Sequence, residues 1–309
     1  MNATRAGVKR GPIRLCEVAP RDGLQNESRI LPVETKVAFI DQLSAAGFPE
    51  IEVGSFVRPD AIPQLADTSE VFKGITRHEG VIYSALVPNE RGLENALQSD
   101  VDKVSVFTAA SERFAQENVG ASIRETIDRF KPVVIGARRA QVPVRAYISC
   151  VVSCPYEGRI DPAKVREVAV KLLEIGVSEL DLGETLGVAS PADMDRLLEA
   201  LDGVWAPNEI TMHLHDTNGS ALACAFRALQ LGVRSFDCSC GGLGGCPYAP
   251  GSAGNLASED LIYLCDGLGL GTDVSLESVL EAARSIFGEL SLAPRSRLAS
   301  ACGPQSPAS

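Results

Sequence analysis

The first residues that can do chemistry are Arg21, Asp22 and Gly23, which follow an apolar stretch at residues 13–18. An apolar run that ends near a proline and a glycine is typical of a strand ending in a sharp turn. A carboxylate at such a strand end can hold a metal ion, and an arginine beside it can hold the charge of a developing oxyanion. The alternative is a turn closed by an Arg21–Asp22 salt bridge.

The second group is His213 and His215, two of the chain's three histidines, which flank Leu214. Side chains two residues apart on a strand point to one face, so both imidazoles can share one metal ion. Asp22 can supply a carboxylate oxygen from across the site, and Asn255 can add an amide oxygen. Two nitrogens and two oxygens favour octahedral Mg²⁺ or Mn²⁺ over a closed zinc site. Two unrelated histidines are the alternative.

One of the nine cysteines, Cys246, lies in a glycine-rich loop at residues 241–254, where a thiol can act as an acid or a base. The chain contains no CxxC pair, which argues against a structural zinc cage. In the C-terminal tail, Cys302 is expected to be an inert surface thiol. The remaining cysteines considered are expected to be small buried apolar residues, namely Cys16, Cys150, Cys224, Cys238, Cys240 and Cys265.

The elements that position these residues alternate between short β-branched runs and amphipathic helical patterns. Eight strands are expected, at residues 13–19, 50–56, 81–87, 103–108, 144–152, 179–184, 209–215 and 235–240. Helices are expected at residues 33–46, 121–140, 162–175, 191–201 and 221–231, with two more at 256–268 and 276–290. This order predicts a single (β/α)8 TIM barrel with a C-terminal helical extension and a glycine-rich lid loop after strand eight. A doubly wound open sheet is the alternative, but no GxGxxG turn follows the first strand.

A TIM barrel carries its active site at the C-terminal ends of its strands. The candidate residues fall near those ends: Arg21 and Asp22 after strand one, Glu52 and Ser55 in strand two, Glu184 at the end of strand six, His213 and His215 at the end of strand seven, and Cys246 and Asn255 after strand eight.

Composition sets limits on the function. With 45% hydrophobic and 22% charged residues among 309, the chain can bury a large core. A net charge of −11 argues against nucleic acid or an anionic membrane as partners. We expect a basic arm at residues 1–12, a barrel domain including its C-terminal helices at 13–293, and a flexible tail at 294–309.

Location is expected to be cytoplasmic. The basic N-terminal residues lack the apolar core of a secretory signal, and no run of about 18 apolar residues is present. Cysteines without such a signal are expected to be thiols in a reducing compartment. A mitochondrial location is the alternative, because the basic N-terminus is similar to part of a transit peptide.

Four segments stand out: VAPRDGLQNE at 18–27, SCPYEG at 153–158, HLHDT at 213–217 and GLGGCPYA at 242–249. Through them the chain resembles the 3-hydroxy-3-methylglutaryl-CoA lyase family, over roughly residues 13–268. The resemblance departs from the family pattern where Glu184 replaces an aspartate, and where residues 239–242 read Ser-Cys-Gly-Gly instead of Ser-Val-Ala-Gly.

The resemblance implies retro-Claisen cleavage of 3-hydroxy-3-methylglutaryl-CoA to acetyl-CoA and acetoacetate, in leucine degradation, with Mg²⁺ or Mn²⁺ as cofactor and a homodimer as the assembly. It does not identify the residues that contact coenzyme A, for which Arg58 and Lys103 are only nearby cations. It implies these roles: Asp22, His213, His215 and Asn255 as metal ligands, Arg21 as the stabiliser of the enolate oxygen, Glu52 as a polar member of the catalytic pocket, Cys246 as a proton-transfer residue, and Glu184 as a further catalytic carboxylate.

Three other functions fit the same pattern. One is a sister lyase acting on a longer branched 3-hydroxyglutaryl-CoA, such as an isohexenyl analogue. The second is a condensing enzyme that uses acetyl-CoA, against which the Cys246 loop argues. The third is a catalytically silent barrel that serves as a binding module.

Overall fold

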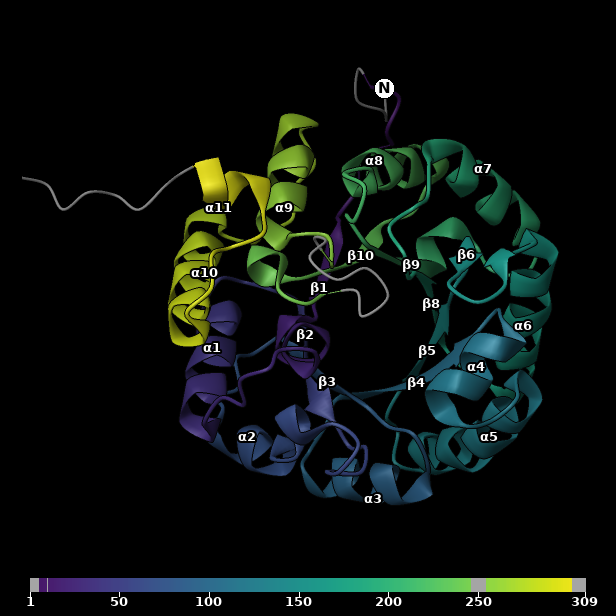
Figure 1. Cartoon of the computed structure of the whole chain (residues 1–309), viewed down its shortest axis with the longest axis horizontal. Helices are drawn as coiled ribbons and strands as arrows, with labels where there is room; N and C mark the ends of the chain where they lie inside the picture. The colour runs from purple at the N-terminus through teal and green to yellow at the C-terminus, as the bar shows by residue number, and fades with distance from the viewer. Residues whose placement is uncertain (1–5, 10, 246–253, 302–309) are drawn as a thin grey trace, which may run out of the picture.

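The computed structural model describes residues 6–9, 11–245 and 254–301, which form a closed barrel of parallel strands ringed by helices (Figure 1). Consecutive barrel strands are neighbours, and β1 closes the barrel by pairing with β10. The expected TIM barrel is therefore confirmed. Its strands are β1 Arg14–Glu17, β2 Glu50–Ser55, β3 Ile82–Leu86, β4 Lys103–Ala109, β5 Val144–Ser149, β8 Glu179–Glu184, β9 Ile210–Leu214 and β10 Ser235–Cys238.

The helices form the outer layer, and a two-stranded hairpin of β6 Ser153–Cys154 and β7 Gly158–Arg159 follows β5. As expected, α6 and α7 each begin with a proline, and α6 ends at Gly176, whose φ of 96° is in the left-handed region. The helices after the first strand are α1 Val33–Ala45, α2 Thr68–Gly74, α3 Glu90–Gln98, α4 Glu112–Val119, α5 Ile123–Arg139, α6 Pro162–Ile175, α7 Pro191–Ala200, α8 Ala221–Leu231, α9 Ser258–Gly267, α10 Leu276–Leu290 and α11 Arg297–Ala301.

The helices α2, α3 and α4 were missed by the sequence pattern. Each spans fewer than ten residues, which leaves too few turns for a clear helical period. Two of them are capped by side chains: Asn89 accepts a hydrogen bond from the Gly92 backbone N at 3.0 Å, and Ser111 accepts one from Phe114 at 3.0 Å. Local capping therefore defines these helices more clearly than periodicity does.

The end of the described chain packs on the barrel, so the segment expected to be a flexible tail from residue 294 is folded as far as residue 301. The backbone N atoms of Arg295 and Ser296 donate to the Gly241 carbonyl at 2.8 and 3.1 Å. Arg297 N donates to Asp260 Oδ2 at 2.9 Å. In the described ranges, no helix has both the length and the apolar character needed to cross a membrane.

Candidate metal centre and active site

The turn after β1 positions Arg21 and Asp22. Residues Ala19–Gly23 form one π-helical turn, in which the Val18 carbonyl accepts from the backbone N atoms of residues 21, 22 and 23. A Cβ on Gly23 would lie only 3.1 Å from the Leu243 side chain and 3.2 Å from its carbonyl oxygen. A glycine is therefore needed here for the close approach to the start of the glycine-rich loop.

The strand end of β9 brings both histidines to the same place as Asp22. One ligand atom from each of Asp22, His213 and His215 lies within 4.8 Å of the others. The two Nε2 atoms are 3.2 Å apart, and His213 Nε2 is 3.9 Å from Asp22 Oδ2. Leu214 is buried on the opposite side, as the alternation along a strand predicts. The expected convergence of these three residues is found.

Asn255 completes this set of candidate ligands. It pairs with His215 through a backbone bridge, and its Nδ2 donates to Asp22 Oδ2 at 2.9 Å and to the Leu243 carbonyl at 3.2 Å. Its Oδ1 is buried and has no hydrogen-bond partner among the described residues. An unsatisfied buried acceptor costs about 1–3 kcal/mol. A cation bound by this oxygen would remove that cost, so the donor set fits Mg²⁺ or Mn²⁺.

The protonation states also suit metal binding. Burial raises the pKa of Asp22, but the charge of Arg21 and of the nearby histidines outweighs burial and lowers this pKa to about 2. Burial and the neighbouring His213 charge lower the pKa of His215 to about 4. An ionised carboxylate and a neutral imidazole are the forms that bind metals.

Arg21 lies between two carboxylates and is only 6% exposed. Its Nη1 is 2.5 Å from Asp22 Oδ1, and its Nε is 2.5 Å from Glu52 Oε2, which also accepts from the Tyr147 hydroxyl at 3.2 Å. The alternative of a turn closed by an Arg21–Asp22 salt bridge is therefore confirmed in part. The two Asp22 oxygens have separate partners, since Oδ1 accepts from Arg21 and Gln25 while Oδ2 faces Asn255 and His213.

Glu184 lies apart from this cluster. It pairs in register with Leu214, so its side chain leaves the sheet on the side away from His213. Its Oε1 accepts from the Val188 backbone N at 3.2 Å. Burial, partly offset by hydrogen bonds from its own loop, raises the pKa of Glu184 to about 7. A catalytic role for Glu184 stays a prediction.

The expectations for the cysteines can be checked only in part. Cys246 lies outside the described residues, as does Cys302, whereas the six cysteines expected to be buried are buried.

Lys103, considered above as a cation near the substrate, is the first residue of β4 and is buried in ion pairs with Glu50 and Glu179. It therefore lies at the N-terminal end of the barrel, opposite to the end at which a substrate is expected to bind.

Sequence reasoning missed Asp237, Tyr147 and Gln25. Asp237 Oδ2 lies 3.0 Å from His213 Nδ1, Tyr147 contacts Glu52, and Gln25 Nε2 donates to Asp22 Oδ1 at 2.7 Å. The signal for Asp237 was available, because an acid in the middle of a predicted buried strand needs a partner. Gln25 lies in the short helical segment after Gly23, where sequence alone gives no such signal.

A cleft of about 1180 Å³ opens beside the cluster. Arg21 and Asp22 line one part of it, and the arginines Arg58, Arg91 and Arg129 line other parts. Such a cleft at the C-terminal ends of barrel strands is where a substrate is expected to bind. Its arginines supply local positive charge in a chain that is acidic overall.

Comparisons with known proteins identify the family of the chain. A family model described as HMGL-like matches residues 12–286. A 3-hydroxy-3-isohexenylglutaryl-CoA/hydroxy-methylglutaryl-CoA lyase of Pseudomonas aeruginosa is 48% identical, covering 94% of this chain and 96% of the relative. The mitochondrial hydroxymethylglutaryl-CoA lyase of Rattus norvegicus is also 48% identical, covering 94% and 89%. A crystal structure of hydroxymethylglutaryl-CoA lyase from Pseudomonas aeruginosa matches with a TM-score of 0.93 at 46% identity, covering 98% of this chain and 99% of that one.

Proposed function

The chain belongs to the HMGL-like family, and from this premise we propose that it is a hydroxymethylglutaryl-CoA lyase. The reaction is cleavage of 3-hydroxy-3-methylglutaryl-CoA to acetyl-CoA and acetoacetate. The observation that carries the proposal is the meeting of Asp22, His213 and His215 beside Arg21 at the mouth of a large cleft. Incubation with this substrate and Mg²⁺ or Mn²⁺ tests it, and acetoacetate is the product to measure.

The metal would be held by Asp22 Oδ2, the two imidazoles and the Asn255 amide oxygen. When bound, a divalent cation at this position supplies Lewis-acid polarisation of the substrate's hydroxyl and carboxylate oxygens. His213 and His215 contribute imidazole nitrogens, and Asp22 contributes negative charge. Asn255 also ties the site to the start of the glycine-rich loop through the Leu243 carbonyl.

Arg21 supports the step in which the carbon–carbon bond breaks. A base takes the proton of the tertiary hydroxyl, the bonding electrons move onto the thioester oxygen of the departing acetyl group to form its enolate, and the tertiary carbon becomes the carbon of a ketone. A fixed guanidinium with little exposure to water stabilises such a developing negative charge strongly. Glu52 and the ring of Tyr147, 5.3 Å from the guanidinium carbon, hold Arg21 in place.

The cleft explains how an acidic chain accepts an anionic thioester. Coenzyme A carries phosphates, and Arg58, Arg91 and Arg129 place positive charge along the cleft that starts at Arg21. We assign the coenzyme A moiety to this cleft. A homodimer and a cytoplasmic location are parts of the same proposal, which light scattering and cell fractionation test.

Cys246→Ala is expected to lower kcat by about 10²- to 10⁴-fold, because the thiol is proposed to deliver the proton to the acetyl carbanion. Mn²⁺ affinity is expected to persist, since Cys246 is not among the proposed ligands. Steady-state kinetics and Mn²⁺ titration check both parts. Cys265→Ala is the matched control, because Cys265 is buried between the outer helices. An unchanged kcat for Cys246→Ala would contradict the role.

A longer branched acyl chain is the second candidate substrate. The P. aeruginosa relative's name includes the isohexenyl substrate, and the cleft here has apolar lining residues such as Phe56, Leu86 and Phe107. Comparing kcat/KM for the methyl and isohexenyl substrates decides between them. A ratio strongly in favour of the isohexenyl thioester would replace the proposed substrate, and one in favour of the methyl thioester would support it.

A further inference from the structure

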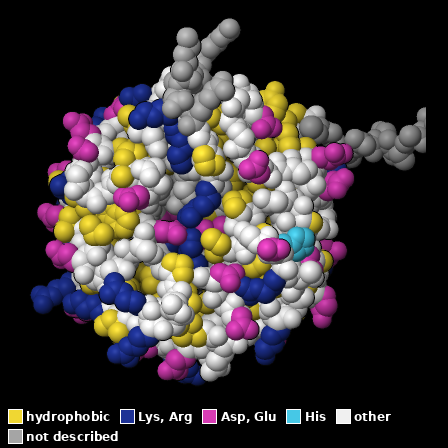
Figure 2. All heavy atoms as spheres, turned by 180° about the vertical axis from the view of Figure 1, so that it is seen from behind, with side chains coloured by type: hydrophobic (Ala, Val, Ile, Leu, Met, Phe, Trp, Pro, Cys, Tyr) yellow, Lys and Arg dark blue, Asp and Glu magenta, His cyan; other side chains and the backbone are white. Residues whose placement is uncertain are grey.

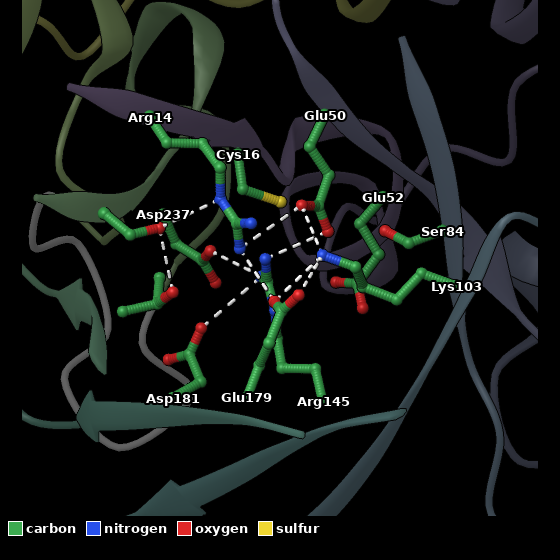
Figure 3. A network of polar contacts seen from close by, with 12 residues as sticks. Arg14, Cys16, Glu50, Glu52, Ser84, Lys103, Arg145, Glu179, Asp181 and Asp237 are labelled. Atoms are coloured by element: carbon green, nitrogen blue, oxygen red, sulfur yellow. Dashed lines mark hydrogen bonds and ion pairs between the residues drawn. The ribbon is translucent and has the colours of Figure 1, made fainter. Parts of the chain in front are cut away.

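A cluster of buried charges lies at the opposite end of the barrel from the cleft. Figure 2 shows the face opposite to that in Figure 1, with Lys or Arg side chains beside Asp or Glu side chains near its middle. Figure 3 shows the buried part of this network, to which six barrel strands contribute. We name it the ionic cluster; its members are Arg14, Glu50, Lys103, Arg145, Glu179, Asp181 and Asp237.

Arg145 is the centre of the ionic cluster and is fully buried. Its Nη2 lies 2.9 Å from Glu50 Oε1, its Nη1 lies 3.1 Å from Asp237 Oδ1, and its Nε lies 3.4 Å from Glu179 Oε2. A buried guanidinium with partners on three sides has a fixed orientation. It therefore also fixes the orientation of the Asp237 carboxylate.

The charges of the ionic cluster are balanced if one acid is neutral. Three cations face four acids, and Asp181 is the acid without any hydrogen bond to either oxygen among the described residues. Burial, together with the nearby Asp237 charge, raises the pKa of Asp181 well above its usual range. Asp237, by contrast, forms an ion pair with Arg145 at 3.1 Å, and an adjacent guanidinium favours the ionised form of a carboxyl group.

Asp237 connects the ionic cluster to the candidate metal centre. It pairs in register with His213 across β10 and β9, so both side chains point to the barrel axis. Asp237 Oδ1 contacts Arg145, while Oδ2 lies 3.0 Å from His213 Nδ1. An ionised carboxylate can only accept a hydrogen bond, so the proton of a neutral His213 belongs on Nδ1.

The position of that proton decides whether the other ring nitrogen, Nε2, has a free lone pair for a metal ion. His213 Nε2 faces His215 Nε2 at 3.2 Å and Asp22 Oδ2 at 3.9 Å. A proton on His213 Nε2 would occupy the direction from which a metal ion must be bound. Carboxylates that accept from the second nitrogen of a metal-binding histidine fix the tautomer and strengthen the ligand.

We propose that Asp237, held by Arg145, is a positioning residue that keeps His213 in the Nδ1–H tautomer and thereby sets the divalent-metal affinity of the centre. This inference rests on the metal centre assigned under the proposed function. Asp237 acts through His213 and does not contact the substrate. Asp237 and Arg145 thus connect one metal ligand to the buried charges below it.

The tautomer can be read directly in the metal-free protein. With only three histidines, ¹⁵N-histidine labelling yields three imidazole spin systems, and exposed His78 serves as the internal reference. Long-range ¹H–¹⁵N spectra of the unmodified protein are expected to show His213 protonated at Nδ1. A proton on Nε2 instead would overturn the inference without any variant.

Asp237→Asn tests the link to metal affinity. Arg145 will hold the new amide oxygen, which turns the amide NH₂ toward His213 Nδ1 and drives the ring proton to Nε2. The Mn²⁺ dissociation constant, measured by electron paramagnetic resonance, is expected to rise about 10- to 100-fold. An unchanged tautomer together with an unchanged dissociation constant would overturn the inference.

Arg14→Gln is the matched control, because Arg14 belongs to the ionic cluster but its contacts in the described part of the chain are with Glu50, Glu179 and Ser235, and not with Arg145, Asp237 or His213. Its Mn²⁺ affinity and His213 tautomer are expected to stay as in the unmodified protein. An equal rise of the Mn²⁺ dissociation constant in both variants would indicate a general loss of structure and overturn the positioning role. A protein that binds Mn²⁺ but cleaves no thioester would contradict the proposed function while leaving this inference intact.

Discussion

Arg21→Met is expected to lower kcat for thioester cleavage by at least about 10²- to 10³-fold, the loss seen when one preorganised oxyanion donor is removed. The reason is that the guanidinium, 6% exposed, is the cation held beside the candidate metal ligands. KM is expected to change far less than kcat, because the interaction forms mainly as charge develops. Steady-state kinetics separate the two quantities.

Removing Arg21 also leaves the buried Glu52 carboxylate without its cation. Arg21→Lys keeps the charge and serves as the conservative variant, with part of the rate expected to remain. Arg58→Met is the control in the same cleft, since its side chain is 80% exposed and its expected effect is on KM alone. A kcat for Arg21→Met close to that of the unmodified enzyme, in a protein with an unchanged melting temperature, would remove Arg21 from catalysis.

His213→Ala is expected to abolish metal-dependent turnover. The substitution removes one of the three converging ligands and the partner of Asp237. Loss of a direct ligand is expected to weaken Mn²⁺ binding by more than the roughly 10- to 100-fold that loss of an outer partner causes. Isothermal titration with Mn²⁺ and the acetoacetate assay measure the two effects.

The control for this variant is His78→Ala, which removes an exposed histidine remote in sequence from the cluster. It is expected to bind Mn²⁺ and to turn over as the unmodified protein does. Chelation with EDTA is expected to abolish turnover by the unmodified enzyme and by the control variant. Added Mg²⁺ or Mn²⁺ is expected to restore turnover in both. Turnover by His213→Ala that still requires metal would show that the ligands lie elsewhere.

Much of the barrel was predictable because its signals are local. Pro162 begins α6 and Gly176 ends it, as their fixed or permissive backbone angles require. The short helices α2 to α4 were missed because too few turns carry the period. The folding of residues 294–301 onto Gly241 was also unpredictable, because it depends on contacts between distant parts of the chain.

The site was predictable where strand geometry alone decides it. His213 and His215 had to share a face, and a barrel brings Asp22 to the same end. Side-chain direction across strands was harder to infer: Glu184 pairs with Leu214 and faces away, while Asp237 pairs with His213 and faces inward. Such pairing depends on register, which one sequence does not reveal. The separate hydrogen-bond partners of the two Asp22 oxygens also depend on how distant parts of the chain pack together.

A titration of the metal-stripped protein with Mn²⁺, following bound metal and thioester cleavage in the same samples, decides whether the Asp22–His213–His215 centre supports the reaction. We predict no cleavage before metal is added, and then a rate that rises in proportion to one Mn²⁺ bound per chain, with acetyl-CoA and acetoacetate formed in equal amounts. Cleavage by the metal-free protein, or full occupancy of the Asp22–His213–His215 centre without products, would contradict it.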